Sequence, residues 1–232
     1  MKNQVTYSYK KNRLSIMLGG FFFLQAATSL IAGAFLFNPL IDDSDITITM
    51  INMANNPFSV QAAIFVDMIT AIGIIILGIC LYQVLKKTDK LLASIGLGLY
   101  IFEATLLIIS KYVAFILLGL STLYADSPSV EVANYASIML DLNGFIYSSH
   151  IIPFGIAAFI FYYLLFKSKV IPTWMSLWGV VTVSVVFIGV VLMMYNVPVP
   201  FLLLVPYVPF EFVVGIYILI KGLRVEENIV TN

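Results

Sequence analysis

The chain has 232 residues, of which 61% are hydrophobic and only 10% are charged. Soluble domains carry about 25% charged residues, so this composition excludes an ordinary soluble protein and indicates an integral membrane protein. The net charge at pH 7 is zero. We expect the lipid bilayer as a partner and no nucleic acid.

Apolar blocks divide the chain into predicted membrane spans. A helix of about 20 residues crosses about 30 Å of hydrocarbon, whereas a barrel would show short alternating segments. The sequence therefore predicts an all-α fold, a polytopic bundle of six transmembrane helices in a single domain over residues 1–232. The predicted spans are 14–37, 60–85, 91–119, 143–166, 171–195 and 200–220, and 38–59 and 120–142 are the longer loops.

The first span, 14–37, follows basic residues as a secretory signal would. Its apolar run is longer than the about 7–15 residues of a secretory core, so we interpret it as a retained span. The one cysteine, Cys80, lies in the second span, which excludes an intramolecular disulfide.

Basic residues gather on one side of the predicted membrane. Every Lys and Arg except Lys111 lies before span one, between spans two and three, between spans four and five, or after span six. The opposite loops carry no basic residue, and their acidic residues include Asp42, Asp43, Asp45, Asp126 and Glu131. By the positive-inside bias, we predict that both termini are cytoplasmic in a cell-membrane protein.

Loop 38–59 is acidic and then mildly apolar, so it is a candidate for a short interfacial segment. Its run of aspartates lacks the spacing and the glycine of a calcium-binding loop. We interpret it as a solvated acidic loop.

Polar side chains inside the spans are the candidates for a functional site. Each costs free energy in lipid and should face the bundle interior, where it can find a partner. The candidates for a ligand or proton site are Gln25, Asp67, Glu103, Asn143, His150 and Glu211.

The depth of these groups follows from the rise of a helix. At 1.5 Å per residue, Gln25, Glu103 and Glu211 lie about 14–18 Å from the cytoplasmic ends of their spans. His150 and Asp67 lie about 24–27 Å from those ends. This distribution predicts a polar centre with a pocket open to the outside.

Two pairings are expected within this set. His150 is the natural partner for Glu103 or Glu211. Lys111, about 30 Å from the cytoplasmic end of span three, is expected to reach the outer interface or to meet Asp67.

Prolines lie beside two of the polar residues. Pro153 follows His150 by three residues, and Pro206 and Pro209 precede Glu211. Because proline removes a hydrogen-bond donor from a helix, we predict kinks at both places. The simpler reading is that proline is commoner in membrane helices than in soluble ones.

Three segments carry a family resemblance: IFEATLLIIS, HIIPFGIAAFIFYYLLFKSKVIPTWMSLWGVV and PFEFVVGIYILIKGL. They resemble a prokaryotic family of integral membrane proteins known as domain of unknown function 4386, and the resemblance extends over nearly the whole chain. It implies a six-span fold and no particular activity, and it favours Glu103, His150 and Glu211 as the site. A departure is Thr173, where the family is often basic.

Three functions stay open. The first is binding or movement of a small solute or of protons, with a homodimer if one chain is too small. The second, less favoured, is an intramembrane enzyme on a lipid-like substrate, with a metal ion held by Glu103, His150 and Glu211. The third is a non-catalytic sensor or accessory protein with structural polar contacts. No phosphate loop, Cys/His metal motif or nucleophile elbow appears in the sequence, so no cofactor is predicted.

Overall fold

Helices account for most of the chain in the computed structural model of the protein, which describes residues 5–195 and 197–228. The α-helices and strands, in chain order, are β1 (Val5–Lys10), α1 (Arg13–Leu30), α2 (Ile46–Asn55), α3 (Pro57–Leu85), α4 (Lys90–Asp126), α5 (Val130–Ser149), α6 (Ile151–Ser168), α7 (Thr173–Met194), α8 (Tyr207–Lys221) and β2 (Leu223–Asn228). A π-helix, η1 (Ile31–Phe37), and two 3-10 helices, η2 (Asn38–Leu40) and η3 (Phe201–Leu203), complete them.

Five helical segments are long and apolar enough to cross a membrane. They are Arg13–Leu40, Pro57–Leu85, Lys90–Asp126, Val130–Ser168 and Thr173–Met194. These five confirm the helical membrane architecture. The predicted sixth span contains the short 3-10 helix η3 and the α-helix α8, whose 15 residues extend about 22 Å.

Both predicted loops contain helix. Helix α2 occupies much of 38–59, and Asp45 caps it by accepting a hydrogen bond from the Thr47 N–H at 2.7 Å. In 120–142, α4 continues to Asp126 and α5 begins at Val130. Helices α4 and α5 extend into this polar part of the sequence because their buried faces pack with α2 and α3 in a second apolar core. Members of this core are Phe37, Leu40, Met50, Met53, Val60, Ala63, Ala114, Leu117, Leu118 and Ala136.

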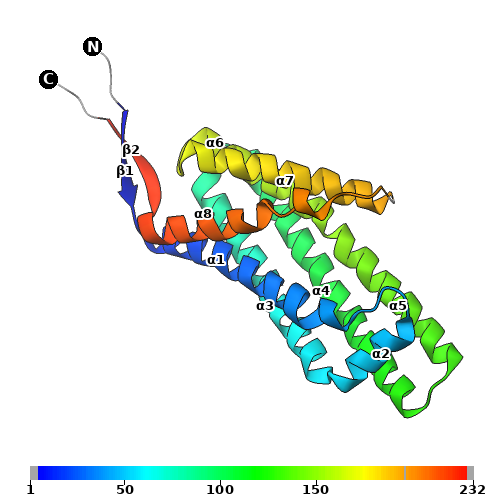
Figure 1. The fold of residues 1–232 in the computed structure, drawn as a ribbon. Coiled ribbons are helices and arrows are strands. Elements are labelled where there is room, and N and C mark those ends of the chain that lie inside the picture. Colours follow the sequence, from blue (N-terminus) through cyan, green and yellow to red (C-terminus); the bar gives the residue numbers. More distant parts are fainter. Residues whose placement is uncertain (1–4, 196, 229–232) are drawn as a thin grey trace.

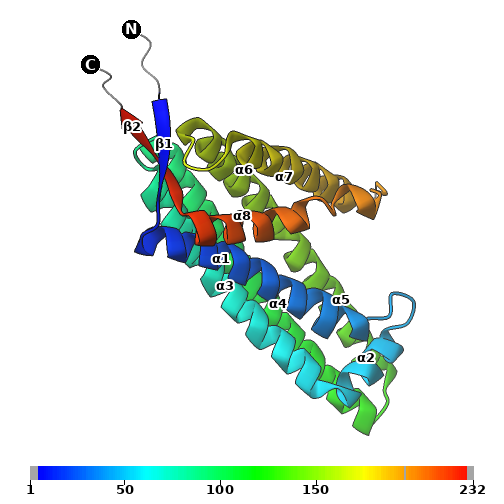
Figure 2. The ribbon, with the colours of Figure 1, turned by 60° about the vertical axis from the view of Figure 1, so that its left-hand side comes forward.

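A two-stranded ribbon is the exception to the all-α prediction. Strands β1 and β2 pair in antiparallel register from Val5 with Asn228 to Lys10 with Leu223. The segment VTYSYK combines β-branched and aromatic residues, which favour a strand. Figures 1 and 2 show the ribbon projecting from one end of the molecule, opposite α2 and the α4–α5 turn.

The main core lies nearer the ribbon, where α1 packs between α3 and α8 and α6 packs between α4 and α7. Helices α1 and α8 lie side by side in both views (Figures 1 and 2). Two glycines permit this close approach. A Cβ added at Gly19 would lie 2.7 Å from the Gly215 carbonyl oxygen, and one added at Gly215 would lie 2.9 Å from the Gly19 carbonyl oxygen.

The predicted kinks have different outcomes. Helix α5 ends at Ser149 and α6 begins at Ile151, so the long helical run breaks at His150, three residues before Pro153. Pro206 and Pro209 do not kink a helix: Pro206 precedes α8 and Pro209 lies in its first turn. Proline is tolerated there because the first turn has no intrahelical acceptors for its N–H groups.

Candidate functional site

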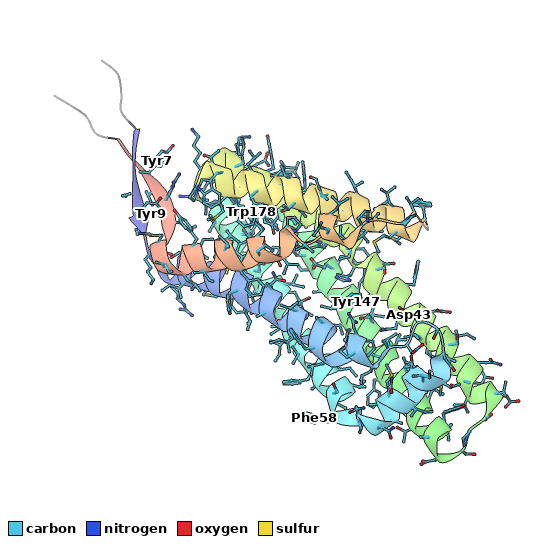
Figure 3. The ribbon with its side chains drawn as sticks, in the orientation of Figure 1. Tyr7, Tyr9, Asp43, Phe58, Tyr147 and Trp178 are labelled. Atoms are coloured by element: carbon cyan, nitrogen blue, oxygen red, sulfur yellow. The ribbon has the colours of Figure 1, made fainter. Side chains whose placement is uncertain are left out.

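A pocket of about 620 Å³ lies at the α2 end of the molecule. It is lined by η1, η2, the acidic loop after η2, and parts of α3, α4 and α5. Asp43 and Asp45 at its rim are exposed, whereas Asp67, Lys111 and Asn143 are buried. The pocket therefore runs from solvent to a polar floor. Figure 3 shows Asp43 and Tyr147 at this end of the molecule, far from Trp178 and Tyr9.

The floor of the pocket holds a buried ion pair. The Lys111 Nζ atom of α4 lies 2.8 Å from Oδ2 of Asp67 on α3, and both side chains are 5% exposed. This confirms the second of the two positions expected for Lys111. Buried ions need such a partner, because the cost of removing a lone charge from water is several kcal/mol.

Two aromatic rings complete the surroundings of the Lys111 ammonium. Its Nζ atom lies 5.1 Å from the ring centroid of Tyr147 and 5.5 Å from that of Phe37. Phe37 ends the π-helix η1, and Tyr147 lies near the end of α5. The sequence analysis missed both aromatics, because a single Phe or Tyr in an apolar span is an ordinary packing residue.

Asn143 contributes an unused hydrogen-bond acceptor. Its side chain lines the pocket and is 5% exposed, and its Oδ1 atom has no hydrogen-bond partner among the described residues. Buried polar atoms are normally paired. The Oδ1 atom is therefore an exception to this rule among the described residues.

The acidic rim is ordered by its own hydrogen bonds. Asp42 Oδ1 accepts from the Ser44 hydroxyl at 2.6 Å, the Ser44 N–H at 2.9 Å and the Asp45 N–H at 3.0 Å. These bonds lower the pKa of the Asp42 carboxyl, and bonds from the Thr47 hydroxyl and N–H likewise lower the pKa of Asp45. Both rim carboxyls are therefore ionised at neutral pH.

His150 lies with the outer residues. Its Nδ1 atom pairs with the Tyr147 carbonyl, and its ring packs on the Tyr147 ring at a centroid distance of 4.8 Å. His150 was expected to pair with Glu103 or Glu211, but its contacts are with Tyr147.

Glu211 and Gln25 belong to a second, inner cluster. The Glu211 Oε1 atom accepts from the Tyr207 hydroxyl at 2.7 Å, and that hydroxyl lies 3.0 Å from the Tyr162 hydroxyl. The Gln25 side chain lies beside the Glu211 carboxyl, as the packing of α1 on α8 requires. All four side chains are buried.

Glu103 joins this inner cluster from α4. It is 4% exposed and lies near Glu211 and Tyr100. Its Oε2 atom has no hydrogen-bond partner in the described part of the chain. The depth estimates had given Gln25, Glu103 and Glu211 a similar level. They gave no sign of the surrounding tyrosines, because a tyrosine in an apolar span is an ordinary packing residue.

The geometry does not favour the metal site that was considered at Glu103, His150 and Glu211. Within residues 5–195 and 197–228, no three His, Cys, Asp or Glu side chains are grouped so that they could hold a metal ion. The candidates divide instead between the outer pocket (Asp67, Asn143 and His150) and the inner cluster (Gln25, Glu103 and Glu211).

Comparison with known proteins agrees with the resemblance noted in the sequence. No curated protein and no solved structure matches the chain significantly. A family model, described as domain of unknown function DUF4386, matches residues 17–222, which include every candidate site residue. The chain is therefore a membrane protein that belongs to the DUF4386 family.

Proposed function

We propose that this protein binds a small solute in the outer pocket and moves it across the membrane together with protons. The observation that carries the proposal is the pocket of about 620 Å³ that leads from an exposed acidic rim to a buried ion pair. Ligand sites are typically pockets of about 300–1,000 Å³ with a few placed polar groups. Charged residues inside membrane helices commonly mark such pathways.

Six crossings with cytoplasmic termini are part of this proposal. Because β1 and β2 pair along their length, both ends of the chain lie on the same side of the membrane, which requires an even number of crossings. Five segments are long enough to cross, so η3 and α8 together supply the sixth. The basic residues at the ribbon end favour a cytoplasmic position for that end, in which case the acidic pocket faces outward.

The inner cluster is the proposed proton site. Two neighbouring carboxyls in a low-dielectric interior cannot both be ionised cheaply, since like charges repel there and neither is solvated. Glu103 and Glu211 lie together with no cation beside them among the described contacts. We therefore propose that at least one of the two carboxyls carries a proton, with the hydroxyl of Tyr207 as a donor to Glu211.

The orientation and accessibility of the pocket are tested by cysteine labelling. In a Cys80→Ser background, Ser137→Cys places a thiol in the pocket lining, and Ser168→Cys at the end of α6 is the control near the ribbon end. An impermeant maleimide should label Ser137→Cys on intact cells and Ser168→Cys only after permeabilisation. The reverse pattern would sink the outward-facing pocket.

Proton coupling is tested by substitution of the inner carboxyl. In vesicles with a pH gradient, Glu211→Gln should abolish the pH dependence of solute uptake. Glu131→Gln, an exposed acid on the first turn of α5, should leave it unchanged. Uptake by Glu211→Gln that still follows the gradient would remove the inner cluster from the mechanism.

A non-catalytic accessory protein is the second candidate. It is favoured by the Lys111–Asp67 pair, which is complete without any ligand. In that case the thiol of Ser137→Cys should react at a rate that no added solute changes. If the protein transports a solute, that solute should protect the Ser137→Cys thiol from the maleimide. In inside-out vesicles the same thiol should also be labelled from the cytoplasmic side, because the pocket would open alternately to the two sides of the membrane.

A further inference from the structure

The Lys111 side chain is held as a receptor holds an organic ammonium ion. A carboxylate oxygen lies 2.8 Å from its nitrogen, and the faces of two aromatic rings lie 5.1 and 5.5 Å away. Carboxylates and aromatic faces are the groups with which proteins recognise ammonium ligands. The chain therefore already contains a cation site, formed by Asp67, Phe37 and Tyr147, and one of its own lysines occupies it.

The remaining polar lining of the pocket also suits a cation. Five carboxyl groups line the pocket, from Asp42, Asp43, Asp45, Asp67 and Asp141, against the single ammonium of Lys111. Such an excess of one sign raises the local concentration of oppositely charged solutes. The charge of the lining disfavours an anionic ligand.

Asn143 gives an independent reason to expect a hydrogen-bond donor in the pocket. Its Oδ1 atom lacks a hydrogen-bond partner among the described residues, although the side chain is only 5% exposed. An entering ammonium group carries three N–H donors and satisfies this acceptor as well as a carboxylate. A carboxylate or phosphate ligand has no donor to offer there.

We propose that the outer pocket binds the primary ammonium group of a small organic solute, and that Lys111 competes with this solute for Asp67. The inference rests on the proposed function, whose solute it assigns to a chemical class. The solute enters past the acidic rim, its ammonium donates to Asn143 Oδ1 and Asp67, and the Lys111 ammonium is displaced from the carboxylate.

The probe is n-butylammonium, which reproduces the end of a lysine side chain. Its binding to the full chain in neutral-lipid nanodiscs is measured by ligand-observed NMR titration, with butyrate and 1-butanol as probes of equal size. Wild-type protein should bind butylammonium and neither of the others. Lys111→Met should bind it about tenfold more tightly, because the competitor that occupies Asp67 most of the time is gone.

Two further variants keep the test decisive if Lys111→Met folds poorly. The double variant Asp67→Asn/Lys111→Met has neither charge and should bind butylammonium more weakly than wild type. Asn143→Leu keeps the ion pair and should weaken binding about tenfold, because the floor then lacks a buried acceptor. Asn134→Leu is the matched control on an exposed face of the same helix and should bind as wild type does.

Each alternative outcome overturns the inference. Preference for butyrate or butanol would show that the pocket binds another class of solute. The proposal of an outward-facing pocket would still hold in that case if Ser137→Cys is labelled from outside. Equal butylammonium binding by all variants would mean association with lipid only. Absence of labelling at Ser137→Cys would instead refute the proposed function itself.

Discussion

The outer pocket and the inner cluster hold charge in a membrane protein in two different ways. In the pocket, Asp67 meets an ammonium at 2.8 Å, and exposed carboxyls connect the pair to solvent. In the inner cluster, Glu103 and Glu211 lie among the buried side chains of Gln25, Tyr162 and Tyr207. The first arrangement neutralises a charge with a counter-charge, and the second uses neutral hydrogen-bond donors.

This difference separates two tasks within one bundle. An ion pair at the base of an open pocket can exchange its partner for an ion from solvent, because the entering ligand replaces a contact of the same kind. A buried carboxyl that accepts from a hydroxyl can exchange a proton without a change of partner. The proposed function accordingly gives solute binding to the outer site and proton exchange to the inner one.

The largest expected effect comes from breaking the outer ion pair. Lys111→Met leaves the Asp67 carboxylate buried without a counter-charge, so the free energy of unfolding should fall by about 3–5 kcal/mol. Asp67→Asn should cost a similar amount, whereas the double variant should lose much less than the sum. Unfolding by SDS in mixed micelles measures these energies. Additive losses would show that the two groups do not act as a pair.

The next effect sharpens the comparison by disturbing the inner cluster alone. A methyl group at Gly19 would lie 2.7 Å from the Gly215 carbonyl oxygen and 2.8 Å from the Leu219 nitrogen, so α1 and α8 must separate. Gly19→Ala should therefore lower the free energy of unfolding by about 1–3 kcal/mol and move Gln25 away from Glu211. Labelling of Ser137→Cys in the outer pocket should not change.

The adjacent glycine supplies the control for that substitution. A Cβ at Gly20 would meet no heavy atom within 4 Å. Gly20→Ala should stabilise helix α1 by about 0.5–1 kcal/mol, because alanine loses less conformational freedom on folding than glycine. Equal losses at the two positions would contradict close α1–α8 contact.

A smaller effect is expected from one hydroxyl of the inner cluster. Tyr207→Phe removes the 2.7 Å hydrogen bond to Glu211 Oε1 and the contact with the Tyr162 hydroxyl. Hydrogen bonds between membrane helices contribute about 0.6–1.7 kcal/mol, so the free energy of unfolding should fall by this amount. Tyr217→Phe, which breaks an exposed hydroxyl pair with Tyr9, should have the smaller effect. A reversed order would argue against the tyrosine–carboxylate network.

The smallest effect concerns the acidic rim and depends on pH. Hydrogen bonds lower the folded-state pKa of Asp42 and Asp45, so their contribution to stability is complete above the ordinary aspartate pKa of about 3.9 and is lost as the pH falls through the lower folded values. Amide hydrogen exchange at Ser44 and Thr47 should therefore show a drop in protection only below about pH 4. In Asp42→Asn, protection of the Ser44 amide should no longer depend on this titration, whereas a drop near neutral pH would contradict the assignment.

Hydropathy alone predicted the membrane helices well, because a crossing helix must be apolar over its whole length. It failed where apolar packing continues past the predicted span, as in the end of α4 near Asp126, and where a short helix such as α2 lies in an acidic loop. The ribbon was missed because its strands lie at opposite ends of the sequence, Val5–Lys10 and Leu223–Asn228, and each is too short to show a pattern by itself.

The depth of each polar residue along its predicted helix was a better guide to the site than the expected side-chain pairs. It placed Gln25, Glu103 and Glu211 at one level, and they do form one cluster. It also placed His150 towards the outer face, where its ring packs on Tyr147. The expected pairing of His150 with Glu103 or Glu211 was wrong, because the helix breaks at His150 and the break sets the direction of its side chain. The contact of Lys111 with Phe37 depends on the π-helix that ends at this residue, and no sequence pattern indicates this change of helical pitch.

The paired strands at the two ends make the chain nearly a closed ring. Val5 lies opposite Asn228, so a short peptide joining the ends would span little distance, and the chain could be opened elsewhere without changing its packing. The turn between Asp126 and Val130 is the natural place for new termini, because it is short and exposed. In the proposed topology, a circular permutant cut there would begin and end on the opposite side of the membrane, while its helices kept their present neighbours.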